Sequence, residues 1–345
     1  MTTLPSPPGP TAEEQRILSY LLPALHELAR REFLSFTQFV QIPESGKGMV
    51  PMSQWPHLLE AIKSLETEDL IVWAKSRQIG ITTILAAFAV FHASFTPRAL
   101  VVIFSRNQSQ SWDFLQKARD IYQALPPELQ IGLTTPDNRE QMTFTNDSRI
   151  IAFPSTLDAA RGLTPTLVIM DEADFHEYLE PCYNSVKPGI DTNRGKMVIT
   201  STVNPYKMGS LFQRFFLDAP ANGFKKLFFG WRARPERTDA WYEETRRTYP
   251  DPALFQKEYP NNEQEAFAPA RAIAAFDQDV LAWMKTRCMP PIEVLTLSNG
   301  VKANIYQEFS PGVRYAAEST DGPFPMSITY DVEDLGGETR LHSVS

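Results

Sequence analysis

The chain has 345 residues, with 33 Lys and Arg against 41 Asp and Glu, so its formal net charge at pH 7 is −8. This length predicts two domains or one large domain with additions, and 43% hydrophobic with 21% charged residues is typical of a globular protein and excludes a disordered one. The negative charge excludes a protein coated with positive charge, so contact with nucleic acid would have to come from a local basic patch.

The beginning of the chain predicts helices after a short tail. Residues 1–12 are rich in Pro, Ser and Thr and are expected to be disordered or loosely attached. An apolar stripe over residues 12–39 predicts a helix that is interrupted at Pro23. A second helix is predicted over residues 54–65, after the turn-like segment GKGMVP.

From residue 70 onward, short apolar strands alternate with helices. Strands are predicted at residues 70–74, 99–104, 167–170 and 196–202, helices at about 82–94 and 108–124, and a hairpin at 142–153 that turns at Asn146-Asp147. This alternation predicts an α/β fold with a mostly parallel sheet covered on both faces. In such sheets, ligands bind at the carboxyl ends of the strands.

The segment KSRQIGITT (residues 75–83) lies between a predicted strand and a predicted helix, as a phosphate-binding loop does. It departs from the standard Gly-Lys-Ser/Thr pattern because Ile81 follows Gly80, while Thr82 occupies the hydroxyl position that would contact Mg²⁺. The missing lysine charge could come from Lys75 or Arg77. Taken alone, the segment also fits an ordinary strand–turn–helix connection.

The segment LVIMDEAD (residues 167–174) favours the nucleotide interpretation. Asp171 follows four apolar residues of a buried strand and could hold Mg²⁺, and Glu172 could polarise an attacking water. An acidic cap after a core strand is the alternative. One strand and one helix separate the two segments, as in ATPases with an additional strand and a catalytic glutamate.

Two weaker signals accompany these motifs. Thr200, Ser201 and Thr202 in ITSTVNP end a predicted strand and could sense a γ-phosphate, although polar strand ends are common in α/β sheets. Gln54 could read an adenine edge through its amide, or it could simply start a helix.

A group of basic residues follows the predicted sheet, between residues 224 and 250. Its members are Lys225, Lys226, Arg232, Arg234, Arg237, Arg246 and Arg247, with Trp231, Trp241 and Tyr242 among them. Contact with a duplex backbone is one interpretation. Because Glu236, Asp239, Glu243 and Glu244 dilute the charge, a solvated helix face is favoured.

In order and spacing, these segments together resemble the large terminase subunit of tailed bacteriophages over roughly residues 35–267. The resemblance rests on FTQFVQI, SQWPHLLEAI, WAKSRQIGITT, NDSRIIAFPSTLDAARGLTPTLVIMDEAD, ITSTVNP, FFGWRARPERTDAWYEE and LFQKEYPNNEQEAF. It implies a P-loop NTPase of the additional-strand, catalytic-glutamate type with an N-terminal helical segment. It also implies a motor that hydrolyses ATP to translocate double-stranded DNA into a procapsid.

The resemblance also implies roles for single residues. Glu172 would be the catalytic carboxylate and Arg77 would act on the γ-phosphate, while Thr82 and Asp171 would serve Mg²⁺. ATP would be bound by Gln54 at the adenine, by Lys75 as a displaced loop lysine, by Ser76, Arg77, Gln78, Ile79, Gly80, Ile81, Thr82 and Thr83, and by the coupling residues Thr200, Ser201 and Thr202. The implied partners are double-stranded DNA, a portal protein, a small terminase subunit and further copies of the chain in a ring, without a membrane.

The domain organisation expected from this resemblance has three parts. Residues 1–50 form a tail and helical segment, residues 51–267 the ATPase domain, and residues 268–345 a linker with an incomplete start of a ribonuclease-H-like nuclease. Only one nuclease strand is recognisable, around 313–321 or 326–331, with Asp321 or Asp331 as its first acid. No nuclease activity is therefore expected.

Two alternatives use the same residues differently. A DEAD-type helicase would share the Asp171-Glu172 motif, but it would keep the loop lysine and need a second RecA-like domain. A degenerate, nucleotide-gated assembly module would explain Ile81, whereas the intact Asp171-Glu172 pair argues against it. Mg²⁺-dependent phosphate release, measured with and without duplex DNA, distinguishes these alternatives.

The remaining composition predicts a soluble, intracellular protein, and the resemblance to large terminase subunits implies the host cytoplasm. Cys182 and Cys288 lie far apart without metal-ligand spacing, which argues against a disulfide framework or a cysteine zinc site. The longest apolar run, residues 84–91, is far shorter than the ~20 residues that span a bilayer. The first ten residues, MTTLPSPPGP, show no secretion signal.

Overall fold

The computed structural model describes residues 11–134, 138–250, 252–268 and 286, and the strands at 293–296, 302–305, 314–319, 326–334 and 339–344. The chain divides into two compact units, residues 1–273 and 274–345. Residues 1–10 of the N-terminal tail lie outside the described residues, so the expected disorder of this tail stays a prediction.

A seven-stranded sheet forms the centre of the first unit, with the strand order β5-β6-β4-β7-β8-β3-β9. Its strands are β3 (Leu70–Lys75), β4 (Leu100–Ser105), β5 (Gln141–Thr143), β6 (Arg149–Pro154), β7 (Leu167–Asp171), β8 (Lys196–Ser201) and β9 (Lys225–Phe229). All neighbouring strands are parallel except β5, which pairs antiparallel with β6. The predicted strands and the predicted hairpin are thus confirmed, with Asp147 in a left-handed conformation at the turn.

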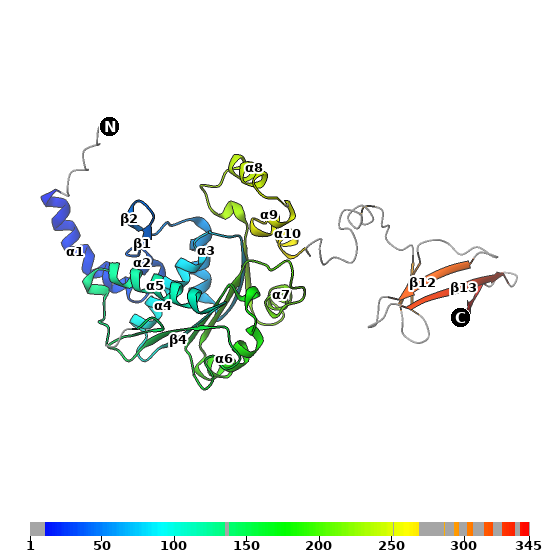
Figure 1. The fold of residues 1–345 in the computed structure, drawn as a ribbon, viewed down its shortest axis with the longest axis horizontal. Helices are drawn as coiled ribbons and strands as arrows, with labels where there is room; N and C mark the ends of the chain where they lie inside the picture. Colours follow the sequence, from blue (N-terminus) through cyan, green and yellow to red (C-terminus); the bar gives the residue numbers. More distant parts are fainter. Residues whose placement is uncertain are drawn as a thin grey trace. The chain divides into compact units, whose positions relative to one another are not determined.

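Helices cover both faces of this sheet, as the apolar strands predict (Figure 1). The helices are α1 (Ala12–Ala29), α2 (Phe33–Thr37), α3 (Pro56–Thr67), α4 (Ile81–Phe95), α5 (Gln108–Ala124), α6 (Leu179–Asn193), α7 (Leu211–Leu217), α8 (Asp239–Arg247), α9 (Pro252–Glu258) and α10 (Glu263–Phe267), with 3₁₀ turns at Pro127–Leu129, Ala173–Phe175 and Trp231–Ala233. Successive strand residues face opposite sides, so Ile71 and Trp73 pack with α3 to α5, whereas Val72 and Ala74 pack with α6 and α7.

The N-terminal segment differs from its prediction in two details. α1 continues through Pro23, which is exposed, and the break between helices comes at residues 30–32 instead. The segment around GKGMVP forms a hairpin of β1 (Gln41–Glu44) and β2 (Gly48–Pro51) rather than a simple turn. Left-handed Gly46 and Gly48, at φ 77° and 80°, make this tight reversal without a Cβ clash.

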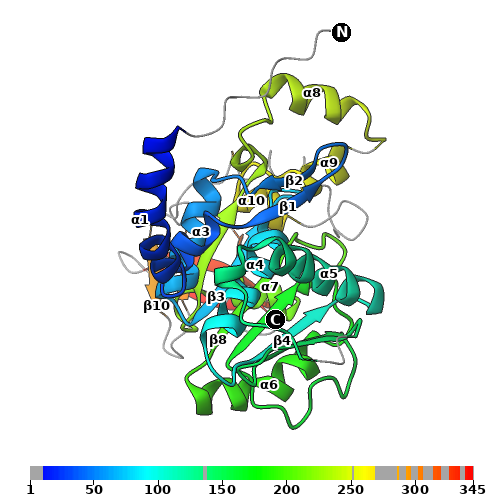
Figure 2. The same ribbon diagram turned by 90° about the vertical axis from the view of Figure 1, so that its left-hand side faces the viewer.

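The basic segment after the sheet is only partly a helix face, so that prediction was wrong for its first residues. Residues 225–229 form β9, which extends the sheet beside β3 because Leu227 and Phe229 join the apolar core. α8 does match the prediction, since none of its residues is buried. It lies at the outer edge of the first unit in both views (Figures 1 and 2).

The second unit contains more strands than the single one predicted. β10 (Glu293–Thr296) and β11 (Lys302–Ile305) form an antiparallel hairpin, and β12 (Arg314–Ser319), β13 (Met326–Asp334) and β14 (Thr339–Val344) form an antiparallel sheet. Asp331 lies on β13 opposite Arg314 and His342, whereas Asp321 lies outside the described residues. The ribonuclease-H-like assignment and the boundary at residue 267 stay predictions.

The described helices include none that is both long and apolar enough to cross a membrane.

Candidate active site

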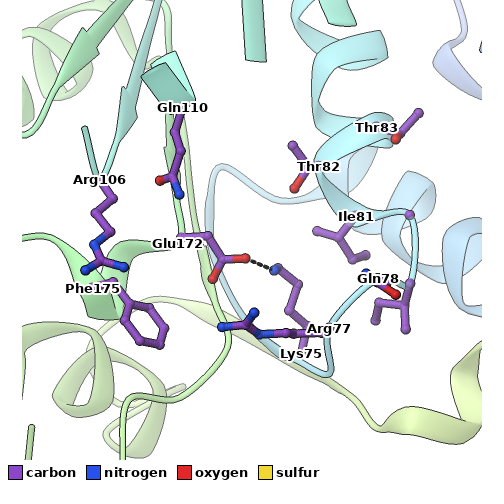
Figure 3. Close-up of a pocket in the computed structure, with 12 residues that line it drawn as sticks. Lys75, Arg77, Gln78, Ile81, Thr82, Thr83, Arg106, Gln110, Glu172 and Phe175 are labelled. Atoms are coloured by element: carbon purple, nitrogen blue, oxygen red, sulfur yellow. Dashed lines mark hydrogen bonds and ion pairs between the residues drawn. The ribbon is translucent and has the colours of Figure 1, made fainter. Parts of the chain in front are cut away.

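A cavity of about 360 Å³ opens at the carboxyl ends of β3, β4 and β7. It is lined by Lys75, Arg77, Gln78, Ile79, Gly80, Ile81, Thr82, Thr83, Arg106, Gln110, Glu172 and Phe175. The loop after β3 and the start of α4 form one side, and Arg106 and Phe175 lie opposite, beyond Glu172 (Figure 3). Sequence segments that are far apart thus meet at the sheet edge where parallel α/β folds bind their ligands.

The loop after β3 has the backbone of an anion site. Gln78 and Gly80 are left-handed, at φ 55° and 83°. In the described part of the chain, the N–H groups of Gln78, Ile79 and Gly80 have no hydrogen-bond partner. Gly80 also caps α4, whose first-turn N–H groups carry partial positive charge. Such consecutive free N–H groups next to a helix start bind phosphate oxygens.

An ion pair crosses the cavity between the loop and the acidic strand end. Lys75 Nζ lies 2.6 Å from Glu172 Oε1, and the second carboxylate oxygen of Glu172 accepts hydrogen bonds from the Thr202 N–H (3.2 Å) and hydroxyl (3.3 Å). Glu172 itself is left-handed at φ 53°, a conformation that costs a non-glycine residue free energy and that surrounding contacts must maintain. The structure thus brings the predicted loop cation, acid and coupling residue together.

These contacts determine the charge states at the centre. Burial alone would raise the pKa of Glu172, but the Lys75 ammonium and its hydrogen bonds lower it, so the carboxylate stays ionised. Burial would lower the pKa of Lys75, yet Glu172 and Asp171 raise it. Glu172 is therefore held as a charged base by a charged lysine.

Asp171 and Thr82 form the second predicted pair. The Thr82 hydroxyl donates to Asp171 Oδ2 at 3.0 Å, and both line a smaller cavity of about 180 Å³ with Ser105 and Gln110. Burial, only partly offset by Lys75, raises the pKa of Asp171 to about 6. Hydroxyl and carboxylate oxygens suit Mg²⁺, which proteins bind through one or two such groups plus substrate phosphates. The described residues hold no cluster of three or more His, Cys, Asp or Glu that could bind a metal.

Arg77 has a different partner from the one its predicted role requires. Its guanidinium pairs with the Glu258 carboxylate at the end of α9, and its N–H donates to the Glu258 carbonyl at 3.1 Å. The side chain is half exposed. Arg77 lines the cavity, but to contact a γ-phosphate its guanidinium has to leave Glu258.

Five predicted nucleotide residues do not line either cavity: Gln54, Ser76, Thr200, Ser201 and Thr202. Ser76 is buried and donates to the Glu258 carbonyl, Thr200 is buried within β8, and the Ser201 hydroxyl accepts the Asp174 N–H. Gln54 lies outside as well, with its Nε2 3.5 Å from the Thr37 hydroxyl. Its adenine role stays a prediction, and of the three coupling residues only Thr202 contacts the acid.

The structure adds residues that the sequence interpretation missed. Three further residues line the cavity opposite the loop: Arg106, Gln110 and Phe175. The sequence could have indicated them only through their positions just after the carboxyl ends of the strands β4 and β7. Arg234 and Arg237, predicted to lie on a solvated face, instead donate to loop carbonyls. No local pattern could have indicated this contact, because it depends on chain folding across the sheet edge.

The fold and the site together define a P-loop NTPase: a mostly parallel sheet, a phosphate loop before a helix, and an Asp-Glu pair at a neighbouring strand end. Residues 72–259, more than half of the chain, match the family described as "Terminase large subunit, T4likevirus-type, N-terminal". The chain therefore belongs to the large terminase subunits, and this family gives it the role of a viral DNA-packaging motor. The predicted family and fold class are confirmed.

Two solved large terminases agree with this fold, and further solved structures are similar to the chain. The large terminase of bacteriophage HK97 is 14% identical, with a TM-score of 0.54, over 91% of this chain and 67% of that chain. The large terminase of a thermophilic bacteriophage is 12% identical, with a TM-score of 0.52, over 85% of this chain and 69% of that chain; it has also been solved with ADP and with ATP-γ-S, where the match covers 64% of that chain. A point mutant of the Thermus phage P74-26 terminase ATPase domain is 22% identical, with a TM-score of 0.49, over 58% of this chain and 90% of that chain.

Proposed function

We propose that this chain hydrolyses ATP in the cavity between the phosphate loop and Glu172, and that it uses this reaction to move double-stranded DNA. The observation that carries the proposal is the Lys75–Glu172–Thr202 cluster beside three free loop N–H groups. The thermophilic bacteriophage terminase that has been solved with ADP and with ATP-γ-S supports a nucleotide ligand.

The chain's own groups supply binding and proton transfer. The N–H groups of residues 78–80 and the start of α4 bind the phosphates, and Lys75 balances their negative charge. Once Lys75 turns to the phosphates, the Glu172 carboxylate is free to accept a proton from the attacking water. Water oxygen then bonds to the γ-phosphorus as the bond from that phosphorus to the ADP oxygen breaks. Bound Mg²⁺, held by Thr82 and Asp171, would neutralise phosphate charge.

Membership of the terminase family favours a DNA-packaging motor over a helicase, because the matched family consists of large terminase subunits. Whether the chain is instead a degenerate, nucleotide-gated assembly module has to be tested by measuring Mg²⁺-dependent phosphate release. We further propose that DNA, a portal protein, a small terminase subunit and neighbouring copies in a ring are the partners, in the host cytoplasm.

The direct test is phosphate release by the purified chain with Mg²⁺, with and without duplex DNA. We expect Glu172→Gln to lower the hydrolysis rate by ~10²–10⁴-fold, the usual contribution of a general base, while ATP-γ-S binding stays within a few-fold. Glu180→Gln, which removes an exposed acid on the following helix, is the matched control. Absence of Mg²⁺-dependent hydrolysis in the wild type would favour the degenerate module, and near-normal turnover of Glu172→Gln would exclude Glu172 as the base.

A further inference from the structure

Three consecutive carbonyls of the phosphate loop are each held by a side chain from outside the loop. The Arg77 carbonyl accepts from Arg237 Nη2 at 2.8 Å, and the Gln78 carbonyl accepts from Arg234 Nη1 at 3.1 Å and Arg237 Nη2 at 3.4 Å. The Ile79 carbonyl accepts from His57 Nε2 at 2.7 Å. No side chain within the loop takes part in these contacts.

A peptide group is planar and its C=O and N–H point in opposite directions. Fixing the carbonyls of residues 77, 78 and 79 therefore also fixes the N–H groups of residues 78, 79 and 80. These are the three N–H groups that have no partner in the described residues. The outer contacts thus determine where the phosphate donors of the loop point.

The backbone of the loop needs such support. Gln78 has φ 55°, which costs a non-glycine residue free energy, and such conformations persist only where surrounding contacts impose them. Both arginines converge on the carbonyl of this residue.

Burial and contacts with aromatic rings fix the position of the Arg237 side chain. Only 8% of the residue is exposed. Its guanidinium stacks on the rings of Trp241 and Tyr259, at 4.8 Å and 5.1 Å from their centres, and also reaches the Ser76 hydroxyl at 3.4 Å. Arg234 stacks on Trp55 at 5.2 Å. Rigid cation–π contacts leave the guanidinium little freedom, so its hydrogen bonds to the loop are preorganised.

We propose that Arg237, with Arg234 and His57 in support, is a positioning residue that sets the phosphate affinity of the loop from outside the cavity. The proposal rests on the proposed nucleotide-binding function. The ligand it affects is any compound with linked phosphates, because the oriented groups are backbone N–H donors. Affinity should change for ADP, ATP-γ-S and inorganic tripolyphosphate by similar factors, since all three place phosphates on the same loop.

The test is isothermal titration of these three ligands with the wild type and the Arg237→Gln, Arg237→Lys and Arg234→Gln variants. Arg237→Gln removes a charge-assisted hydrogen bond to the loop. We expect this loss to weaken the binding of each ligand by ~10-fold. We expect losses of ~3-fold for Arg237→Lys, which keeps the charge and one donor, and for Arg234→Gln. The matched control is Arg232→Gln, because Arg232 also stacks on a tryptophan and pairs with an acid but donates to no loop atom in the described structure.

Two further readouts separate positioning from a general loss of structure. Hydrogen exchange at the amides of residues 78–80 should accelerate in ligand-free Arg237→Gln but not in Arg232→Gln. In steady state, KM for ATP should rise ~10-fold while kcat falls less than ~3-fold, because the outer contacts act on binding.

The outcomes are distinct. A folded Arg237→Gln variant that binds all three ligands as the wild type does would overturn the proposal. If Arg237→Gln does not fold, unchanged affinity in both Arg237→Lys and Arg234→Gln would overturn it equally, and weakened binding in either, with Arg232→Gln normal, would support it. A wild type that binds none of the ligands would instead refute the proposed function.

Discussion

At the scale of single residues, the site contains two non-glycine residues in left-handed conformations. Gln78 bends the loop that faces the phosphates, and Glu172 turns its carboxylate toward Lys75 after the buried strand β7. Such backbone costs free energy, and the surrounding contacts, the loop arginines in one case and Lys75 and Thr202 in the other, hold it in place. Two of the six left-handed non-glycine residues in the described part of the chain thus belong to the groups to which we assign binding and catalysis, whereas Arg98, Asp147, Ala160 and Arg194 lie elsewhere.

The two loop cations should behave differently when removed. Lys75 is buried and paired with the base, so Lys75→Ala should weaken ATP-γ-S binding by at least ~10-fold, the loss of a charge-assisted contact. Arg77 is half exposed and paired with Glu258, so Arg77→Ala should leave binding within ~3-fold and mainly lower kcat. Titration and steady-state kinetics measure both, with Lys47→Ala, at an exposed hairpin loop, as control. Normal binding and turnover in Lys75→Ala would leave Arg77 as the only loop cation.

At the scale of elements, α4 shows how one helix serves two needs. Its N-terminus follows Gly80 and faces the cavity, while its apolar body, with Ile84, Leu85 and Phe88 buried, packs against the sheet. The helix that carries Thr82 is therefore anchored along its whole length, which keeps the phosphate-binding end in a fixed position. Near its other end, His92 bonds to the Thr166 hydroxyl at 3.0 Å.

His92 should make the stability of the protein depend on pH. Burial, with a smaller effect of Lys196, lowers its pKa from 6.5 to about 4. Because the unfolded chain binds the proton more readily, the stabilisation is fully present above pH 6.5 and is lost as the pH falls toward 4. The melting temperature should therefore fall between pH 7 and pH 5, and His92→Gln should show a smaller fall. An identical pH dependence in that variant would show that other groups cause it.

At the scale of the whole molecule, charge and assembly determine DNA binding. The chain carries a net charge of −8, and much of the basic segment after the sheet is engaged within the protein, with Arg234 and Arg237 on the loop and Lys226 paired with Glu263. Within the described part of the chain, this segment therefore offers a duplex few cations that are not already engaged. High affinity would have to come from several copies around one DNA molecule.

Duplex binding by the isolated subunit should be weak, with Kd no tighter than ~10⁻⁶ M at physiological salt, and should weaken further between 50 and 200 mM salt. Fluorescence anisotropy of a labelled duplex measures this. Replacing Arg246 and Arg247 with Gln on the exposed helix α8 should change the affinity less than ~2-fold, because neighbouring Glu243 and Glu244 already balance their charge. Tight, salt-insensitive binding would contradict a motor that acts only when assembled.

The sequence by itself determined the α/β class, the strands β3, β4, β6, β7 and β8 and the phosphate loop. Periodicity, apolar runs and motif order are local properties that survive without knowledge of the fold. The tertiary structure alone decided that β9 joins the sheet edge, that Arg77 pairs with Glu258, that Thr202 rather than Thr200 or Ser201 reaches Glu172, and that Arg234 and Arg237 hold the loop. Each of these contacts joins residues far apart in the chain, and the direction of a side chain depends on which neighbours the packed strands and loops place beside it. For this reason the sequence indicated most of the residues that line the site, whereas the residues that hold them in position were visible only in the folded molecule.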